Sequence, residues 1–151
     1  MRRVVGLKWA KRIAECPWPP RRRSPGGSKA AGLRFERVVA KALGTGMHNP
    51  WFEYEDANGI GHCAPDFILS VEGRLVVMEC KLTATWDAWD QLQHLYLPVV
   101  GLAAGATPIP VEIARAVGPK RVVVDSLAEA LRRVEEQPVL HWLGRGRFPW
   151  R

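Results

Sequence analysis

Asp66, Glu79 and Lys81 are charged residues near the two ends of a largely apolar stretch of the chain, "CAPDFILSVEGRLVVMECKL". The stretch predicts two strands joined by a tight turn at Glu72 and Gly73. Pairing the strands across a two-residue turn places Asp66 opposite Glu79, where the two side chains are close. Lys81 projects from the same face as Glu79, because side chains alternate along a strand. Two carboxylates and an ammonium group are therefore expected at one end of a buried hairpin.

Opposed carboxylates at close range either share a proton or hold a cation between them. Mg²⁺ or Mn²⁺ prefers oxygen ligands and keeps several waters, so Asp66, Glu79 and one main-chain carbonyl would suffice. The carbonyl of Cys80 is the natural third ligand, since the thiol points to the opposite face. Lys81 could orient or help deprotonate a water, or neutralise charge on a phosphoryl transition state. The alternative is an ordinary ion pair between Lys81 and either carboxylate on an exposed face.

The elements around this hairpin predict a mixed α/β domain. Residues 30–43 are expected to form an amphipathic helix that ends at Gly44. A second helix is expected over residues 86–97, with Thr85 as its N-cap and Pro98 kinking or ending it. Further expected elements are a short basic helix within residues 1–15, strands at 51–56, 107–117 and 120–125, and a helix at 126–136.

Pro65-Asp66 followed by Glu79-Cys80-Lys81 resembles the motif of the PD-(D/E)XK nuclease superfamily. The resemblance implies a restriction-endonuclease-like fold, with an αβββαβ core in which helices flank a mixed central sheet. It also implies Mg²⁺-dependent cleavage of DNA or RNA phosphodiester bonds. Asp66 and Glu79 would then bind the metal, and Lys81 would assist the attacking water.

Glu36 is a further candidate for this site. Members of the superfamily often carry a glutamate on the first core helix, and Glu36 lies on the helix expected over residues 30–43. Arg34, Arg37 and Lys41 form one polar stripe, whereas Glu36 falls in the apolar arc. A glutamate on the core-facing side needs a partner, and the metal at the hairpin is one candidate. The alternative is a boundary residue that reaches solvent or pairs with an arginine.

Two subfamilies provide further comparisons. RecB-like members carry Gln-x-x-x-Tyr on the helix after the Glu-x-Lys strand, whereas here Gln91 stands five residues and Gln93 three residues before Tyr96. We therefore expect Gln91 as a site candidate and Tyr96 as a core residue. The small size and compact hairpin also resemble archaeal-type Holliday-junction resolvases. That resemblance implies a homodimer acting on four-way DNA.

The positive charge is concentrated at the N-terminus. The chain has a net charge of +7; residues 1–29 hold nine Lys/Arg and one Glu, whereas residues 30–151 hold thirteen Lys/Arg and fourteen Asp/Glu. Such an arm suits sequence-independent contact with DNA, without excluding RNA, since phosphate contacts release counterions. The expected contacts are Arg21, Arg22, Arg23, Lys29 and His62. The alternative is a solubilising tail.

The chain is expected to have three parts: a basic arm and linker (1–29), a nuclease domain (30–138) and an aromatic, basic tail (139–151). Without a long apolar run or a secretory leader, we expect no membrane span. Three cysteines without a CxxC pair indicate reduced thiols and a cytoplasmic location. Sixteen Arg against six Lys suggest a GC-rich genome, and the compact design would suit a phage.

These features together predict a divalent-metal-dependent deoxyribonuclease that hydrolyses phosphodiester bonds with metal-activated water. Three alternatives stay open at this point. The first is a structure-selective Holliday-junction resolvase, the second is a non-catalytic nucleic-acid-binding protein of the same fold, and the third is an interaction module whose arm binds an acidic partner.

Overall fold

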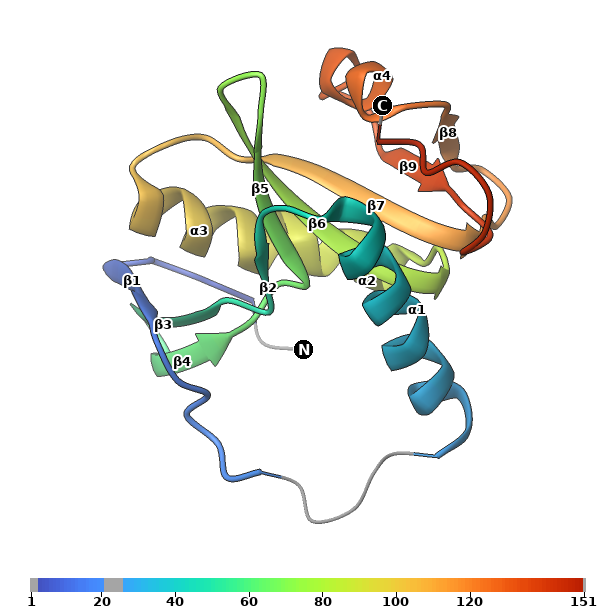
Figure 1. The fold of residues 1–151 in the computed structure, drawn as a ribbon. Coiled ribbons are helices and arrows are strands. Elements are labelled where there is room, and N and C mark those ends of the chain that lie inside the picture. Colours follow the sequence, from blue (N-terminus) through green and yellow to red (C-terminus); the bar gives the residue numbers. More distant parts are fainter. Residues whose placement is uncertain (1–2, 21–25, 151) are drawn as a thin grey trace.

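The computed structural model describes residues 3–20 and 26–150, which form a mixed α/β arrangement with two sheets (Figure 1). The main sheet has the strand order β2 (Met47–His48), β5 (Phe67–Val71), β6 (Arg74–Thr83), β7 (Ile109–Ala116), β9 (Pro138–His141) and β8 (Val122–Val124). The smaller sheet has the order β1 (Trp9–Ile13), β3 (Trp51–Asp56) and β4 (Gly59–Cys63). The α/β class expected from the sequence is confirmed.

The hairpin of β5 and β6 has the predicted register. Val71 pairs with Arg74, so the turn contains only Glu72 and Gly73. Both turn residues have positive φ, 51° for Glu72 and 75° for Gly73, as a type I′ turn requires. The ladder ends at the pair of Phe67 with Met78, and Asp66 and Glu79 follow directly beyond it.

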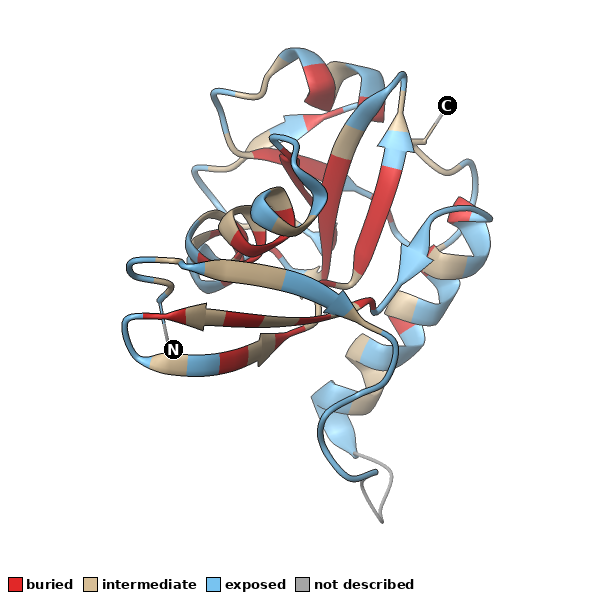
Figure 2. Ribbon diagram, turned by 90° about the vertical axis from the view of Figure 1, so that its left-hand side faces the viewer, coloured by how far each residue is buried: buried red, intermediate tan, exposed pale blue. Residues whose placement is uncertain are grey.

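Helices cover both faces of the main sheet, which explains why its central strands are apolar without alternation (Figure 2). One face packs against α1 (Gly27–Leu43) and α4 (Leu127–Arg132). The other packs against a continuous helical segment made of α2 (Trp86–Gln91), the π-helix η1 (Leu92–Tyr96) and α3 (Leu97–Ala104). Glu79 shares the second face with Val77, because the two residues are two positions apart on β6.

The smaller sheet begins with a strand where a helix was expected. Residues 9–13 of the N-terminal segment form β1, which pairs antiparallel with β3, so the helix predicted within residues 1–15 is wrong. The partner strand decides the outcome, since β structure depends on cross-strand pairing more than on local preference. Phe52 and Tyr54 of β3 turn inward onto the helical segment, whereas Trp51 and Glu53 lie on the outer face.

The prediction allowed two outcomes at Pro98, a kink or the end of the second helix, and the end is wrong, because the helical segment runs on to Ala104. The N–H of Leu97 bonds to the carbonyl of Leu92, five residues back, as in a π turn. Pro98 thus stands in the first turn of α3, where a missing N–H is tolerated.

The C-terminal elements expected from the sequence are present, and one further strand follows them. The strands expected at 107–117 and 120–125 and the helix at 126–136 are present as β7, β8 and α4. Residues 138–141, at the start of the expected tail, form β9 between β7 and β8. Beyond it, Phe148 packs edge-on against Trp142 with ring centroids 4.7 Å apart. No helix among the described residues has the length and apolar character needed to cross a bilayer.

Candidate functional site

Asp66 is fixed at the end of the hairpin by two hydrogen bonds. Its Oδ2 accepts a bond of 2.7 Å from the main-chain N–H of Cys80, and its carbonyl accepts one of 2.8 Å from the N–H of Asn49. In a strand, the N–H and C=O of one residue point to the same edge. The Cys80 carbonyl therefore faces the Asp66 side of β6, as its predicted role as a ligand requires.

Glu79 and Lys81 form a close ion pair beside Asp66. Lys81 Nζ lies 2.9 Å from Oε1 of Glu79, whose residue is 3% exposed. The other oxygen, Oε2, is buried and makes no hydrogen bond of good geometry among the described residues. Leaving such an atom without a partner in the core is costly. Binding a proton or a cation at Oε2 of Glu79 would remove this cost.

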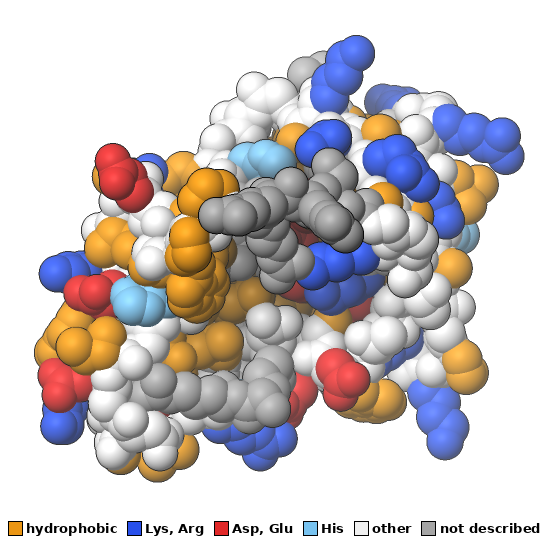
Figure 3. Space-filling view, turned by 90° about the horizontal axis from the view of Figure 1, so that it is seen from below, with side chains coloured by type: hydrophobic (Ala, Val, Ile, Leu, Met, Phe, Trp, Pro, Cys, Tyr) orange, Lys and Arg blue, Asp and Glu red, His pale blue; other side chains and the backbone are white. Residues whose placement is uncertain are grey.

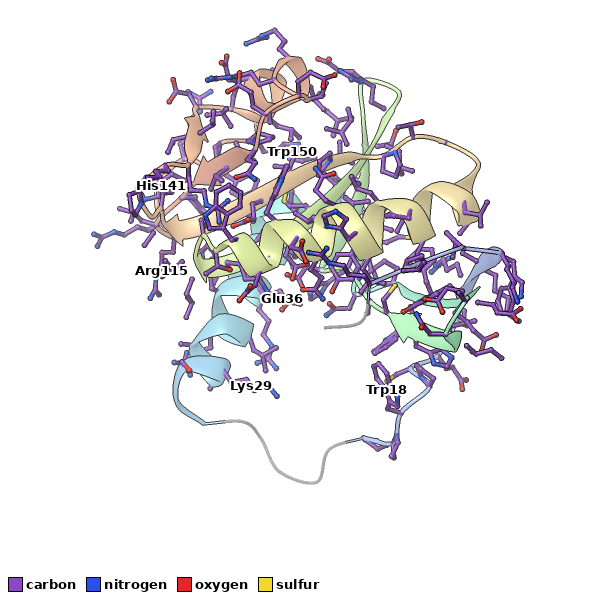
Figure 4. All side chains as sticks on the ribbon, turned by 180° about the vertical axis from the view of Figure 1, so that it is seen from behind. Trp18, Lys29, Glu36, Arg115, His141 and Trp150 are labelled. Atoms are coloured by element: carbon purple, nitrogen blue, oxygen red, sulfur yellow. The ribbon has the colours of Figure 1, made fainter. Side chains whose placement is uncertain are left out.

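Glu36 approaches the same place from α1 (Figure 4). Its Oε1 accepts a hydrogen bond of 2.9 Å from Nδ2 of Asn49 and lies 2.8 Å from Nε2 of His48. Sequence reasoning missed both partners. The signal in the sequence was the asparagine before Pro50, because asparagine tolerates a positive φ better than most residues. In the structure Asn49 has a φ of 51°.

The ionisation of these groups reflects their crowding. Burial, together with the negative charges of Glu79 and Glu36, raises the pKa of Asp66 to about 8. Burial also raises the pKa of Glu79, and Lys81 only partly opposes this effect. Burial lowers the pKa of Lys81, but the Glu79 carboxylate outweighs it and the net pKa is raised. The mutual effects indicate that Glu36, Asp66, Glu79 and Lys81 share one electrostatic environment.

Gln91 and Tyr96 are brought together by the π-helix. Gln91 Nε2 donates a hydrogen bond of 2.6 Å to the phenolic oxygen of Tyr96, although five residues separate them. A π turn makes positions i and i+5 neighbours, as an α turn does for i and i+4. Burial and the charges of Glu79 and Asp66 raise the pKa of Tyr96, so its phenol lies near the carboxylates. Tyr96 is buried, as expected of a core residue, and it also borders the site.

Glu112 is a buried carboxylate that sequence reasoning did not single out. It pairs in register with Glu79 on the parallel strand β7, and the two side chains therefore share one face of the sheet. The residue is 0% exposed, and neither side-chain oxygen makes a hydrogen bond of good geometry within the described chain. Burial raises its pKa to about 7, although Arg121 and Lys81 oppose this effect. Its position inside the run "TPIPVEIARAV" was the available signal.

The structure describes two of the five predicted nucleic-acid contacts, His62 and Lys29. His62 belongs to β4 and lies 3.0 Å from Oε2 of Glu53 on the outer face of the smaller sheet. Lys29 is exposed near the start of α1, on the same side of the molecule as Trp18 (Figure 4). Arg21, Arg22 and Arg23 lie outside the described residues.

The donor atoms suit a divalent ion only in part. Within residues 3–20 and 26–150, no three His, Cys, Asp or Glu side chains are arranged to hold a metal. The available set is two carboxylates, Asp66 and Glu79, with the main-chain carbonyl of Cys80 on the same edge. The observation that fits a cation is the buried Oε2 of Glu79, which makes no hydrogen bond of good geometry among the described residues.

No family model, no curated protein and no solved structure matches this chain.

Proposed function

We propose that the protein is a divalent-metal-dependent nuclease that hydrolyses DNA phosphodiester bonds. The observation that carries the proposal is the gathering of Asp66, Glu79 and Lys81 at one end of the hairpin, with the Oε2 atom of Glu79 buried and without a hydrogen bond of good geometry among the described residues. An ion pair between Lys81 and Glu79 alone does not account for the state of Oε2 of Glu79 or for the raised pKa of Asp66. A bound cation would bind that oxygen and would favour the ionised form of Asp66.

Each residue has a role in this proposal. Asp66 and Glu79, with the Cys80 carbonyl, would hold Mg²⁺ or Mn²⁺. When bound, such an ion polarises the phosphate and lowers the pKa of its water. Lys81 stays protonated beside Glu79, so we assign it hydrogen bonding and charge neutralisation at the phosphoryl oxygens rather than proton abstraction. Glu36, oriented by His48 and Asn49, borders the cation site and adds negative charge to it.

The arrangement of the main sheet supports a restriction-endonuclease-like core as the finer description of the fold. Helix α1, the strands β2, β5 and β6, the helical segment from Trp86 to Ala104 and strand β7 follow one another in that order. Strand β7 lies beside and parallel to β6, across the crossover helix. The β3–β4 hairpin stands outside this core in the smaller sheet.

The Gln91–Tyr96 pair supports the resemblance to RecB-like nucleases. The spacing of five differs from the four of that family, and the π-helix compensates for the additional residue by bringing the two side chains into contact. We propose that Gln91, held by the Tyr96 hydroxyl, contacts the DNA strand or a water at the site.

Cleavage assays with matched variants test the proposal. Linear duplex, circular, single-stranded and four-way DNA would be incubated with Mg²⁺, Mn²⁺ or EDTA, which also separates a general nuclease from a junction resolvase. We expect Asp66→Asn, Glu79→Gln and Lys81→Met each to lower kcat by about 10²- to 10⁴-fold while DNA affinity in EDTA changes little. The control is Glu135→Gln, an exposed carboxylate on the turn after α4.

Two results would overturn this function. If all three site variants keep wild-type rates, the catalytic assignment is wrong. If the wild type binds DNA but cuts none of the four forms with either metal, a non-catalytic nucleic-acid-binding protein is the better description.

A further inference from the structure

Trp18 is a large aromatic side chain that is held in place yet exposed. Its ring centroid lies 4.9 Å from that of Trp51 with the planes at 81°, and 6.2 Å from the ring of His62. Even with these contacts the residue is 55% exposed. A tryptophan that served only to anchor the N-terminal segment would be expected to bury more of its apolar surface.

The surroundings of Trp18 form a preformed hollow of about 570 Å³, within the usual size range of small-ligand sites. The residues that line it are mainly aromatic rings and prolines: Cys16, Trp18, Pro19, Pro20 and Trp51. The two prolines restrict the backbone that carries Trp18. A flat ligand entering the hollow would therefore meet aromatic surface with little loss of conformational freedom.

This hollow adjoins the carboxylate site through the segment between β2 and β3. Asn49 contacts both Asp66 and Glu36. Trp51 follows Asn49 by two residues, so the Cα atoms of Asn49 and Trp51 are at most about 7 Å apart. Figure 4 shows Trp18 and Lys29 in the lower part of the molecule, with Glu36 above them near its centre. Figure 3, which views the molecule from below, shows hydrophobic side chains gathered on one part of the face and Lys and Arg side chains on another.

We propose that the hollow of Trp18 and Trp51 stacks an unpaired base of the DNA strand whose phosphate reaches the proposed cation site at Asp66 and Glu79. This inference rests on the proposed nuclease function and assigns it a substrate class, DNA with a single-stranded segment. Bases stack on exposed aromatic rings without regard to sequence, because every base has a π-face. The basic side chains on the same face favour a nucleic acid over an apolar peptide, since they match the phosphate backbone.

The experiment measures binding in EDTA, so that cleavage does not interfere. A fluorescein-labelled oligothymidylate and a blunt duplex of equal length would be titrated with the wild type and with Trp18→Ala, Trp18→Leu and Trp18→Phe. We expect Trp18→Ala and Trp18→Leu to bind the single strand about 5- to 100-fold more weakly, while duplex affinity changes less than about twofold. Trp18→Phe should retain most of the affinity because it keeps a π-face.

Trp86→Ala is the matched control. Trp86 is also exposed, but the Arg121 guanidinium already covers its ring, with Cζ 4.1 Å from the centroid. This variant should bind the single strand as the wild type does.

The leucine variant separates stacking from apolar packing. If Trp18→Leu binds the single strand as tightly as the wild type, or if Trp18→Ala weakens duplex and single strand equally, the stacking inference is wrong. In that case a wild type that still cuts DNA leaves the nuclease proposal intact. A wild type that neither binds nor cuts any DNA overturns both.

Discussion

Gln91 donates a hydrogen bond of 2.6 Å to the hydroxyl of Tyr96 across a π turn, so that two residues five positions apart act as one unit beside the buried carboxylates. An α-helix would rotate these side chains apart, because five residues advance well beyond one turn of 3.6. The local helix geometry is therefore part of the site.

Deleting one residue from the π turn should restore an α turn and preserve this pair. His94 is the choice, because its side chain is 52% exposed. Deleting it gives a spacing of four, so we expect the free energy of unfolding to change by no more than about 2 kcal/mol. Inserting Ala after His94 should instead separate the two side chains and lower activity. Urea unfolding and DNA cleavage measure the effects; equal damage by deletion and insertion would contradict the π-turn explanation.

Stability should fall with rising pH because of Asp66. Its pKa is near 3.8 in the unfolded chain and about 8 in the fold, so the protonated form is favoured in the folded state. That contribution is complete below about pH 4 and is lost as the pH rises to 8, with a slope of at most about 1.4 kcal/mol per pH unit.

Urea unfolding of the wild type and Asp66→Asn in EDTA at pH 4.5, 6 and 8 checks this expectation. The variant should become more stable relative to the wild type as the pH increases. A difference that does not vary with pH would show that Asp66 titrates normally in the fold.

Glu112 predicts a second, separable pH effect. Its pKa rises from 4.5 to about 7, so the stability gained from its protonated form is complete below about pH 4.5 and lost as the pH passes 7. Glu112→Gln keeps the shape of the side chain and removes its charge. The free energy of unfolding of the variant, minus that of the wild type, should therefore be about 1–3 kcal/mol higher at pH 8 than at pH 5. Thermal unfolding at the two pH values measures the change. An unchanged difference would mean that a partner neutralises this carboxylate.

Divalent ions should stabilise the protein through Asp66 and Glu79. An ion that binds only the folded state at 100 times its Kd adds about 2.7 kcal/mol to the free energy of unfolding. Mg²⁺ or Mn²⁺ should therefore raise the Tm of the wild type and of Glu135→Gln, but not of Asp66→Asn or Glu79→Gln. Equal shifts in all four proteins would point to nonspecific binding of the ion.

Asn49 should matter both for its backbone and for its side chain. Its φ of 51° disfavours Ala, and its amide orients Glu36. We expect Asn49→Ala to cost about 1–3 kcal/mol of stability, and Asn49→Gly to recover part of that loss because glycine accepts positive φ. Both variants should lower cleavage, since neither supplies the amide that bonds Glu36, which then keeps its contact with His48. Normal activity of Asn49→Gly would show that the Asn49 amide is not needed to position Glu36.

The sequence alone predicted the hairpin and the charged residues at the end opposite its turn. The turn at Glu72 and Gly73 set the pairing of β5 with β6, because a two-residue turn permits only one register. Alternation along β6 then placed Glu79 and Lys81 on one face, and the helical period placed Glu36 toward the core. These are local rules that act over a few residues, so they can be read before the fold is known.

Only the tertiary structure decided the remaining features. Strand β1 depends on its partner β3, and the proximity of Glu112 to Glu79 depends on the parallel register of β6 and β7. The π turn that joins Gln91 to Tyr96 lies in a helical segment that packs against Val77 and its neighbours. In each case the deciding contact joins residues far apart in the chain, and a local pattern contains no information about which distant segment supplies it.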